Sequence, residues 1–93
     1  MGAPEVNLKV LMGKEGYPAY RRLVGGTSYY RILHAKRFEE LQLIGKRWLY
    51  LDVDAKAYPE QLRVREMMDM AGPFDELDAQ EWERALRLAG KQH

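Results

Sequence analysis

Apolar and polar residues alternate through much of the first half of the chain. In residues 5–12 (EVNLKVLM) every second side chain is apolar, which predicts a half-buried strand, because successive side chains of a strand point to opposite faces. Residues 19–24 and 29–34 carry aromatic and β-branched side chains on either side of GGTS, a pattern typical of a β-hairpin. In the second strand of this hairpin, one face would present Tyr30, Ile32 and His34 and the other Tyr29, Arg31 and Leu33.

Residues 35–44 (AKRFEELQLI) are compatible with two structures. As a helix, the strong helix formers of this segment would end at Gly45. As a strand, the segment would form a hairpin with residues 48–54 (WLYLDVD), whose regular alternation predicts a strand. We favour the hairpin, with its turn around Gly45 and Lys46. Its inner face would then combine Leu41 and Leu43 with Leu49, Leu51 and Val53, and its other face Glu40, Gln42, Trp48 and Tyr50.

Helical spacing replaces the alternation after residue 54. Pro59 can begin a helix over residues 59–71, which Gly72 and Pro73 stop. A second helix begins at Asp78, whose carboxylate can cap it, and ends at Gly90. The apolar face of the first helix would consist of Val64, Met67, Met68 and Ala71, and that of the second of Trp82, Ala85, Leu86 and Ala89.

Strands first and helices last are typical of an α+β domain. We predict a single domain over residues 1–93, with a small antiparallel sheet of three to five strands followed by two C-terminal helices packed on one face. The chain has no cysteine, so its stability must come from packing and not from disulfides or zinc. It has no run of about 20 apolar residues and no signal-like start, so we expect a cytoplasmic protein without a membrane partner.

The charge is unevenly distributed. Through Tyr50, nine Lys or Arg against four acids give a formal charge of +5, whereas from Leu51 onward six bases against ten acids give −4. Such asymmetry bears on partners more than on fold. The basic half also holds most of the aromatic rings, and cations beside rings can bind the phosphates and bases of single-stranded nucleic acid. The candidate residues are Arg21, Arg22, Tyr29, Tyr30, Arg31, Lys36, Arg37, Lys46, Arg47, Trp48 and Tyr50.

The same residues also have a purely structural interpretation. Exposed strands often carry Arg and Lys that prevent edge pairing, and Tyr and Trp favour strands in any protein. What separates the two interpretations is whether the bases converge on one face. A second candidate surface is the methionine cluster Met67, Met68 and Met70, which suits either core packing or an interface with a protein partner or a second copy.

Two acids provide the only pattern that suggests catalysis. Asp52 and Asp54 lie two apart on a predicted strand and so share a face, and with Lys56 they resemble the second half of the (D/E)xK nuclease motif. The match is three letters long, and a strand end with solvated charges that leads into a helix explains it better. His34 is the only internal histidine, and no hydroxyl lies in a strained nucleophile turn. We therefore predict no catalytic residue, no metal and no cofactor.

These observations rank three functions. We expect a small non-enzymatic protein-interaction or assembly module, including one that associates with itself as a homodimer. The alternative is a single-stranded nucleic-acid-binding domain that uses the basic, aromatic half. A metal-dependent nuclease comes third.

Overall fold

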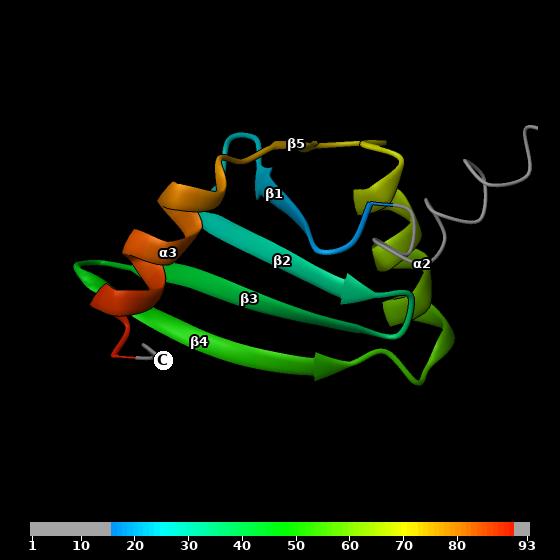
Figure 1. Cartoon of the computed structure of the whole chain (residues 1–93), viewed down its shortest axis with the longest axis horizontal. Coiled ribbons are helices and arrows are strands. Elements are labelled where there is room, and N and C mark those ends of the chain that lie inside the picture. The colour runs from blue at the N-terminus through cyan, green and yellow to red at the C-terminus, as the bar shows by residue number, and fades with distance from the viewer. Residues whose placement is uncertain (1–15, 91–93) are drawn as a thin grey trace, which may run out of the picture.

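The computed structural model describes residues 16–90, which form a five-stranded antiparallel sheet and two helices (Figure 1). The fold is therefore α+β, as the sequence predicts. The order of strands across the sheet is β4-β3-β2-β1-β5. The strand predicted over residues 5–12 lies outside the described residues. The elements are β1 (Ala19–Leu23), β2 (Ser28–His34), β3 (Arg37–Ile44), β4 (Arg47–Asp54), α2 (Tyr58–Met68), β5 (Phe74–Glu76) and α3 (Ala79–Leu88).

Both predicted hairpins are present. β1 pairs with β2 around the glycine turn, and β3 pairs with β4 over all eight residues of each strand. The turn between β3 and β4 has only two residues, Gly45 and Lys46, and Gly45 has a φ of 64°, a conformation that favours glycine. Residues 37–44 are thus a strand, and the helical alternative for this segment is excluded.

The predicted faces of the second hairpin are wrong. Because the short turn places Ile44 opposite Arg47, Leu41 lies opposite Tyr50 and Leu43 opposite Trp48. Residues directly opposite each other in an antiparallel pair share a face. Leu41 and Leu43 therefore share a face with the two aromatic residues. The other three apolar residues of β4 (Leu49, Leu51 and Val53) lie on the opposite face with Phe38, Glu40 and Gln42.

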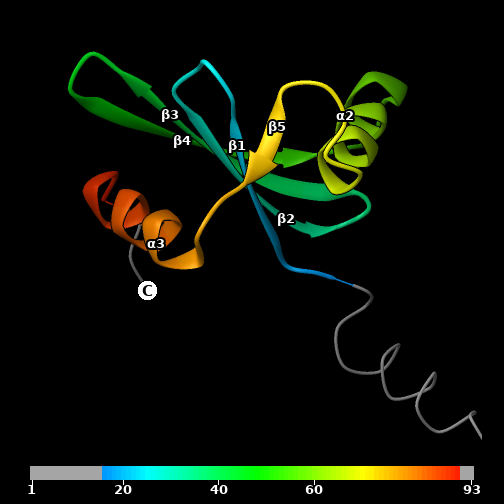
Figure 2. The same cartoon turned by 90° about the horizontal axis from the view of Figure 1, so that it is seen from above.

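The two helices lie on opposite faces of the sheet, which corrects the prediction that both pack on one face (Figure 2). The reason is β5, which separates them in the chain. Phe74, at the start of β5, packs against the cluster beneath α2, whereas Leu77, just after β5, is buried in the cluster beneath α3. The chain thus changes face as it follows the edge of the sheet.

Each face of the sheet has its own apolar cluster. We call the face that contacts α2 the α2 face; its buried cluster is Ala19, Tyr30, Ile32, Phe38, Ala55, Val64 and Met67. We call the opposite one the α3 face; its buried cluster is Leu41, Leu77, Trp82, Ala85 and Leu86. Each helix covers only one end of its face (Figure 1). Part of the sheet therefore has no helix of the described chain above it.

Local sequence explains where the helices begin and end. The Asp78 carboxylate accepts a hydrogen bond from the Gln80 amide at 2.8 Å, as expected of a capping residue, and Gly90 ends α3 with a φ of 78°. Helix α2 begins one residue before Pro59 and ends at Met68, short of its predicted end at residue 71. Ala71 is therefore exposed and not part of the apolar face. In the described part of the chain, neither helix is long and apolar enough to cross a membrane.

Candidate interaction surface

Two of the predicted phosphate-binding arginines are engaged inside the fold. The Arg21 Nε donates to the Met67 carbonyl oxygen at 2.8 Å and so ties β1 to the end of α2. The Arg31 Nε donates to one carboxylate oxygen of Glu39, and the Tyr50 hydroxyl donates to the other. Both hydrogen bonds are 2.5 Å long. Only 21% of the Arg31 side chain and 10% of the Glu39 side chain are exposed. These cations stabilise the fold and are not directed toward an external anion.

Two further arginines pair with acids on the surface. Arg37 binds both carboxylate oxygens of Asp52, at 3.1 and 2.7 Å, and Arg22 approaches Asp75 at 3.4 Å. The hydrogen bond and charge of Arg37 lower the pKa of Asp52 below its usual range. In the predicted nucleic-acid set, the remaining bases are Lys36, in the β2–β3 turn, and Lys46 and Arg47, at the β3–β4 turn.

The basic residues do not converge on one face. Arg21 lies opposite Tyr30 and hence on the α2 face, whereas Arg22 lies opposite Tyr29 on the α3 face. Arg31 and Arg37 also lie on the α3 face, and Arg47 on the α2 face. Lys36 and Lys46 lie in turns at opposite ends of β3. The sequence-level charge asymmetry thus does not become a single basic surface among the described residues.

The aromatic residues are divided in the same way. Tyr30 is buried on the α2 face, where its ring contacts Phe38 and Phe74. Tyr29 and Trp48, with ring centroids 5.2 Å apart, are partly buried with Tyr50 against the α3 cluster. Burial and the hydrogen bond to Glu39 raise the pKa of Tyr50 to about 12. These rings do not form one exposed stacking platform.

The three candidate methionines lie in different environments, and the two candidate aspartates are paired with basic side chains. Met67 is fully buried in the α2 cluster, Met68 is partly buried against it, and Met70 is exposed beyond the end of α2. Asp52 and Asp54 share the α3 face, as predicted, but Arg37 binds the first and Lys56 pairs with the second at 3.7 Å. Among the described residues no group of three His, Cys, Asp or Glu is arranged to hold a metal ion.

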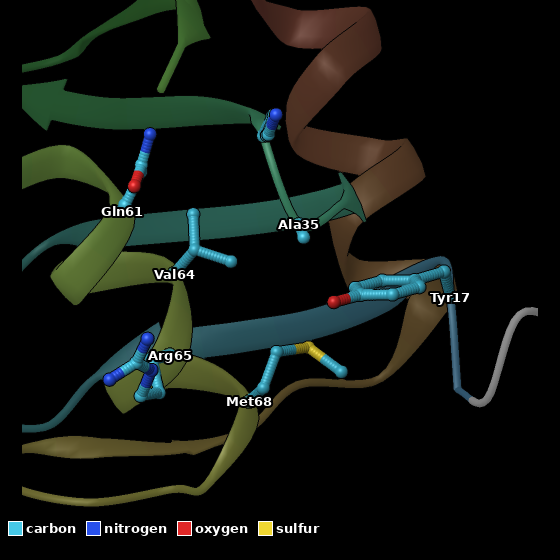
Figure 3. Close-up of a pocket in the computed structure, with 7 residues that line it drawn as sticks. Tyr17, Ala35, Gln61, Val64, Arg65 and Met68 are labelled. Atoms are coloured by element: carbon cyan, nitrogen blue, oxygen red, sulfur yellow. The ribbon is translucent and has the colours of Figure 1, made fainter. Parts of the chain in front are cut away.

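A cavity of about 260 Å³ lies beside α2 (Figure 3). Val64, Met68, Ala35 and the ring of Tyr17 surround it, and the remaining lining residues are Lys36, Gln61 and Arg65. The Gln61 amide donates to the Lys56 carbonyl oxygen at 3.1 Å. Within residues 16–90 the lining contains neither a carboxylate nor an imidazole, so these residues provide no acid–base pair. Its two cations could hold a small anion, but both side chains lie on the surface.

Sequence reasoning missed the outer edge of β4. No described strand pairs with this side of β4, which is an edge of the sheet. Beside it on the α2 face, Ile44, Leu49 and Leu51 are 58%, 45% and 40% exposed. We call these three residues the apolar strip. The sequence signal for the apolar strip is the length of the turn. A two-residue turn at Gly45 and Lys46 sets the β3–β4 register, and this register places Leu49 and Leu51 on the face opposite Leu41.

The backbone of β4 has an outward-facing set of polar groups. The Ala55 amide donates to the Lys36 carbonyl oxygen on the β3 side, at 2.8 Å. In an antiparallel ladder, successive residues direct their amide and carbonyl groups alternately to the two neighbours. Arg47, Leu49, Leu51 and Val53 therefore bond toward β3, as Ala55 does. Trp48 and Asp52, which alternate with these residues, direct their backbone groups to the side of β4 that no described strand pairs with. The Asp54 carbonyl oxygen accepts from the Lys56 amide at 2.8 Å.

The comparisons with known proteins identify no relative. The sequence matches no protein-family profile and no curated protein, and no solved structure matches the fold.

Proposed function

We propose that this protein is a protein-interaction module that binds an extended segment of a partner polypeptide as an added strand along β4. The observation that carries this proposal is the contrast between the two edges of the sheet. β5 has only three residues, two of them acidic, and follows directly after Pro73. Short strands, charges and proline are the ordinary protections against edge pairing. The β5 edge therefore resembles a protected edge.

β4 lacks most of these protections. It has eight residues, contains no Lys or Pro, and pairs with β3 without a bulge. Its centre, Trp48 to Leu51, has four consecutive aromatic or aliphatic residues, and its charges are confined to the two ends. A long regular edge with apolar side chains is the surface to which extended peptides add as strands, through main-chain hydrogen bonds and pockets for alternate side chains.

The surface also specifies the chemistry of the partner. Lys46 and Arg47 lie at one end of β4, and Asp52 and Asp54 at the other. An antiparallel partner strand would therefore match these charges with basic residues at its own amino end and acids at its carboxyl end. Every second side chain should be apolar, to cover Leu49 and Leu51 on the α2 face.

Protein binding is better supported than nucleic-acid binding, which remains the alternative. Four of the seven candidate bases pair or bond within the protein, and the seven are spread over both faces and the turns. The stacking candidates are buried or partly buried. Neither feature favours a surface that follows a phosphate backbone.

The proposal can be tested with two synthetic nine-residue peptides of alternating valine and threonine. One has Lys at its amino end and Asp at its carboxyl end, and the other has these charges exchanged. NMR titration of the whole chain with the first peptide should shift the backbone amides of Trp48 and Asp52. N-methylation of alternate peptide nitrogens should abolish this binding, because it removes the main-chain donors that strand addition requires.

Matched variants locate the binding. Leu49→Lys together with Leu51→Lys should weaken binding, because they place charge on the apolar strip. Val24→Lys is the control, since Val24 is similarly exposed, at 50%, but lies just after β1. Equal binding of the N-methylated and the unmodified peptide would overturn the proposal. So would peptide binding that shifts only the amides around α2.

A further inference from the structure

We infer that the strand that adds to β4 is β4 of a second copy, so that the protein forms an antiparallel, two-fold symmetric dimer. This inference rests on the proposed function, because it names the partner for the same edge. A two-fold contact must be self-complementary, so each residue of β4 has to suit the residue that the symmetry places opposite it.

The alternation of faces limits the registers. Residues directly opposite in an antiparallel pair share a face, so a residue of the α2 face must lie opposite one of the partner's α2 face. The register that pairs Arg47–Val53 along its full length places Leu49 opposite the partner's Leu51, and Leu51 opposite the partner's Leu49. On the other face, the outward backbone groups of Trp48 lie opposite those of the partner's Asp52. Both leucines would thereby be covered.

Charge complementarity supports this orientation and register. The strand begins at Arg47, directly after Lys46 in the turn, and ends with Asp52 and Asp54, so antiparallel pairing brings each basic end beside an acidic end. In the proposed register Lys46 lies beside the partner's Asp54. A parallel arrangement would instead place like charges together, which opposes association.

Neighbouring registers fit less well. Shifting the pair by two residues in one direction brings Lys46 beside the partner's Lys56. Shifting it by two in the other direction shortens the paired region to five residues and places Arg47 opposite the partner's Leu51. The proposed register is the one that matches the leucines and the charges at the same time.

Sedimentation velocity over a range of protein concentrations measures the association. The parent should sediment as a monomer–dimer equilibrium, and Leu49→Lys should weaken dimerisation at least tenfold while Val24→Lys leaves it unchanged. Lys46→Glu and Asp54→Lys should each weaken it several-fold, because either one creates two like-charge contacts in the dimer. Lys46→Glu combined with Asp54→Lys should restore it. Asp54 is exposed and Lys46 lies in an exposed turn, so the melting temperatures of the monomers should stay similar.

Cysteine cross-linking measures the register independently, since the chain has no cysteine of its own. Opposed residues of this kind have Cα atoms about 4.5 Å apart, within the distance that a disulfide spans. A mixture of Leu49→Cys and Leu51→Cys proteins should therefore give the mixed dimer on mild oxidation. Each variant alone should cross-link poorly. In a dimer of one variant the two cysteines are displaced by two positions along the strands, so their Cα atoms lie roughly 8 Å apart.

The outcomes separate the two proposals. A parent chain that stays monomeric at all concentrations, while peptides still bind along β4, would overturn the dimer and leave strand addition by another polypeptide. A dimer whose affinity is unchanged by the Leu49 and charge variants would also overturn it, because the contact would lie elsewhere. Failure of both peptides and a second copy to engage β4 would overturn the proposed function as well.

Discussion

Replacement of Trp82 by alanine tests the α3 packing on which the two-faced architecture depends. Trp82 is fully buried and is the largest of the fully buried side chains among the described residues. Its ring lies 6.4 Å from that of Tyr20 and 5.3 Å from the Arg31 guanidinium, measured between ring centroids and to the guanidinium carbon. Deleting a large buried aromatic typically costs about 3–5 kcal/mol. Loss of the cation–π contact with Arg31 adds to the deficit, by about 0.5–2 kcal/mol.

A partly compensating effect should keep the cost within the usual range. The Trp82 indole nitrogen has no hydrogen-bond partner among the described residues, so its removal ends the penalty of burying an unsatisfied donor. We therefore expect Trp82→Ala to lower the free energy of unfolding by about 3–5 kcal/mol. Urea unfolding followed by circular dichroism measures this value, with Leu88→Ala on the same helix as the control, because Leu88 is 68% exposed. A Trp82→Ala protein that unfolds like the parent would refute the assignment of α3 to this face.

Three further predictions follow from charged and polar groups. Glu39→Ala should lower the free energy of unfolding by about 2–4 kcal/mol, somewhat less than the loss for a fully buried pair, because it removes the nearest carboxylate of Arg31 and leaves the more exposed Glu83, at 3.7 Å, as its acidic partner. Asp52→Ala, which breaks an exposed pair, should change it little. Because the pKa of Tyr50 is raised to about 12, its contribution is complete below pH 10 and is lost as pH rises through 12. Urea titrations should accordingly show that the stability difference between the parent and Tyr50→Phe shrinks over this range; a constant difference would contradict the assignment. Fluorescence anisotropy should show no binding of a single-stranded oligonucleotide at physiological salt. Binding that weakens with salt at a log slope of about 0.7 per phosphate contact, and that flattens in Lys46→Ala with Arg47→Ala, would favour the alternative function.

Local patterns predicted the elements of this fold well. The alternation in residues 48–54, the glycine break at residues 25–28 and the cap at Asp78 each depend on nearby residues, and each is present as a strand, a turn and a helix start. The apolar stripe of Trp82, Ala85 and Leu86 is likewise buried. These features are determined by the chain's own periodicity, so a single sequence contains the information.

The faces of the sheet could not be predicted from periodicity alone. Alternation shows that Leu49 and Leu51 share a face, but whether Leu41 shares it depends on whether the turn has an even or odd number of residues. The side on which α3 packs depends on β5, a three-residue strand too short to show a period. For this reason the aromatic residues proposed as stacking platforms proved to lie against the core, whereas Leu49 and Leu51, which were expected on the inner face, proved to be exposed.

The candidate bases illustrate a second limit. A count of charges does not show which are already paired, and Arg31 and Glu39, eight residues apart in sequence, meet only because β2 and β3 are neighbours. The open edge of β4 is also invisible to composition, because it results from the order of strands across the sheet.

Hydrogen exchange at four backbone amides of β4 tests strand addition most directly. In the dilute free chain, the amides of Leu49 and Leu51, which bond toward β3, should exchange slowly, whereas those of Trp48 and Asp52 should exchange fast. As the protein is concentrated into its dimer, or saturated with a peptide that binds, protection at Trp48 and Asp52 should rise toward that of the two leucines. If Trp48 and Asp52 still exchange fast in a fully formed complex, no strand has been added to β4 and the central claim is contradicted.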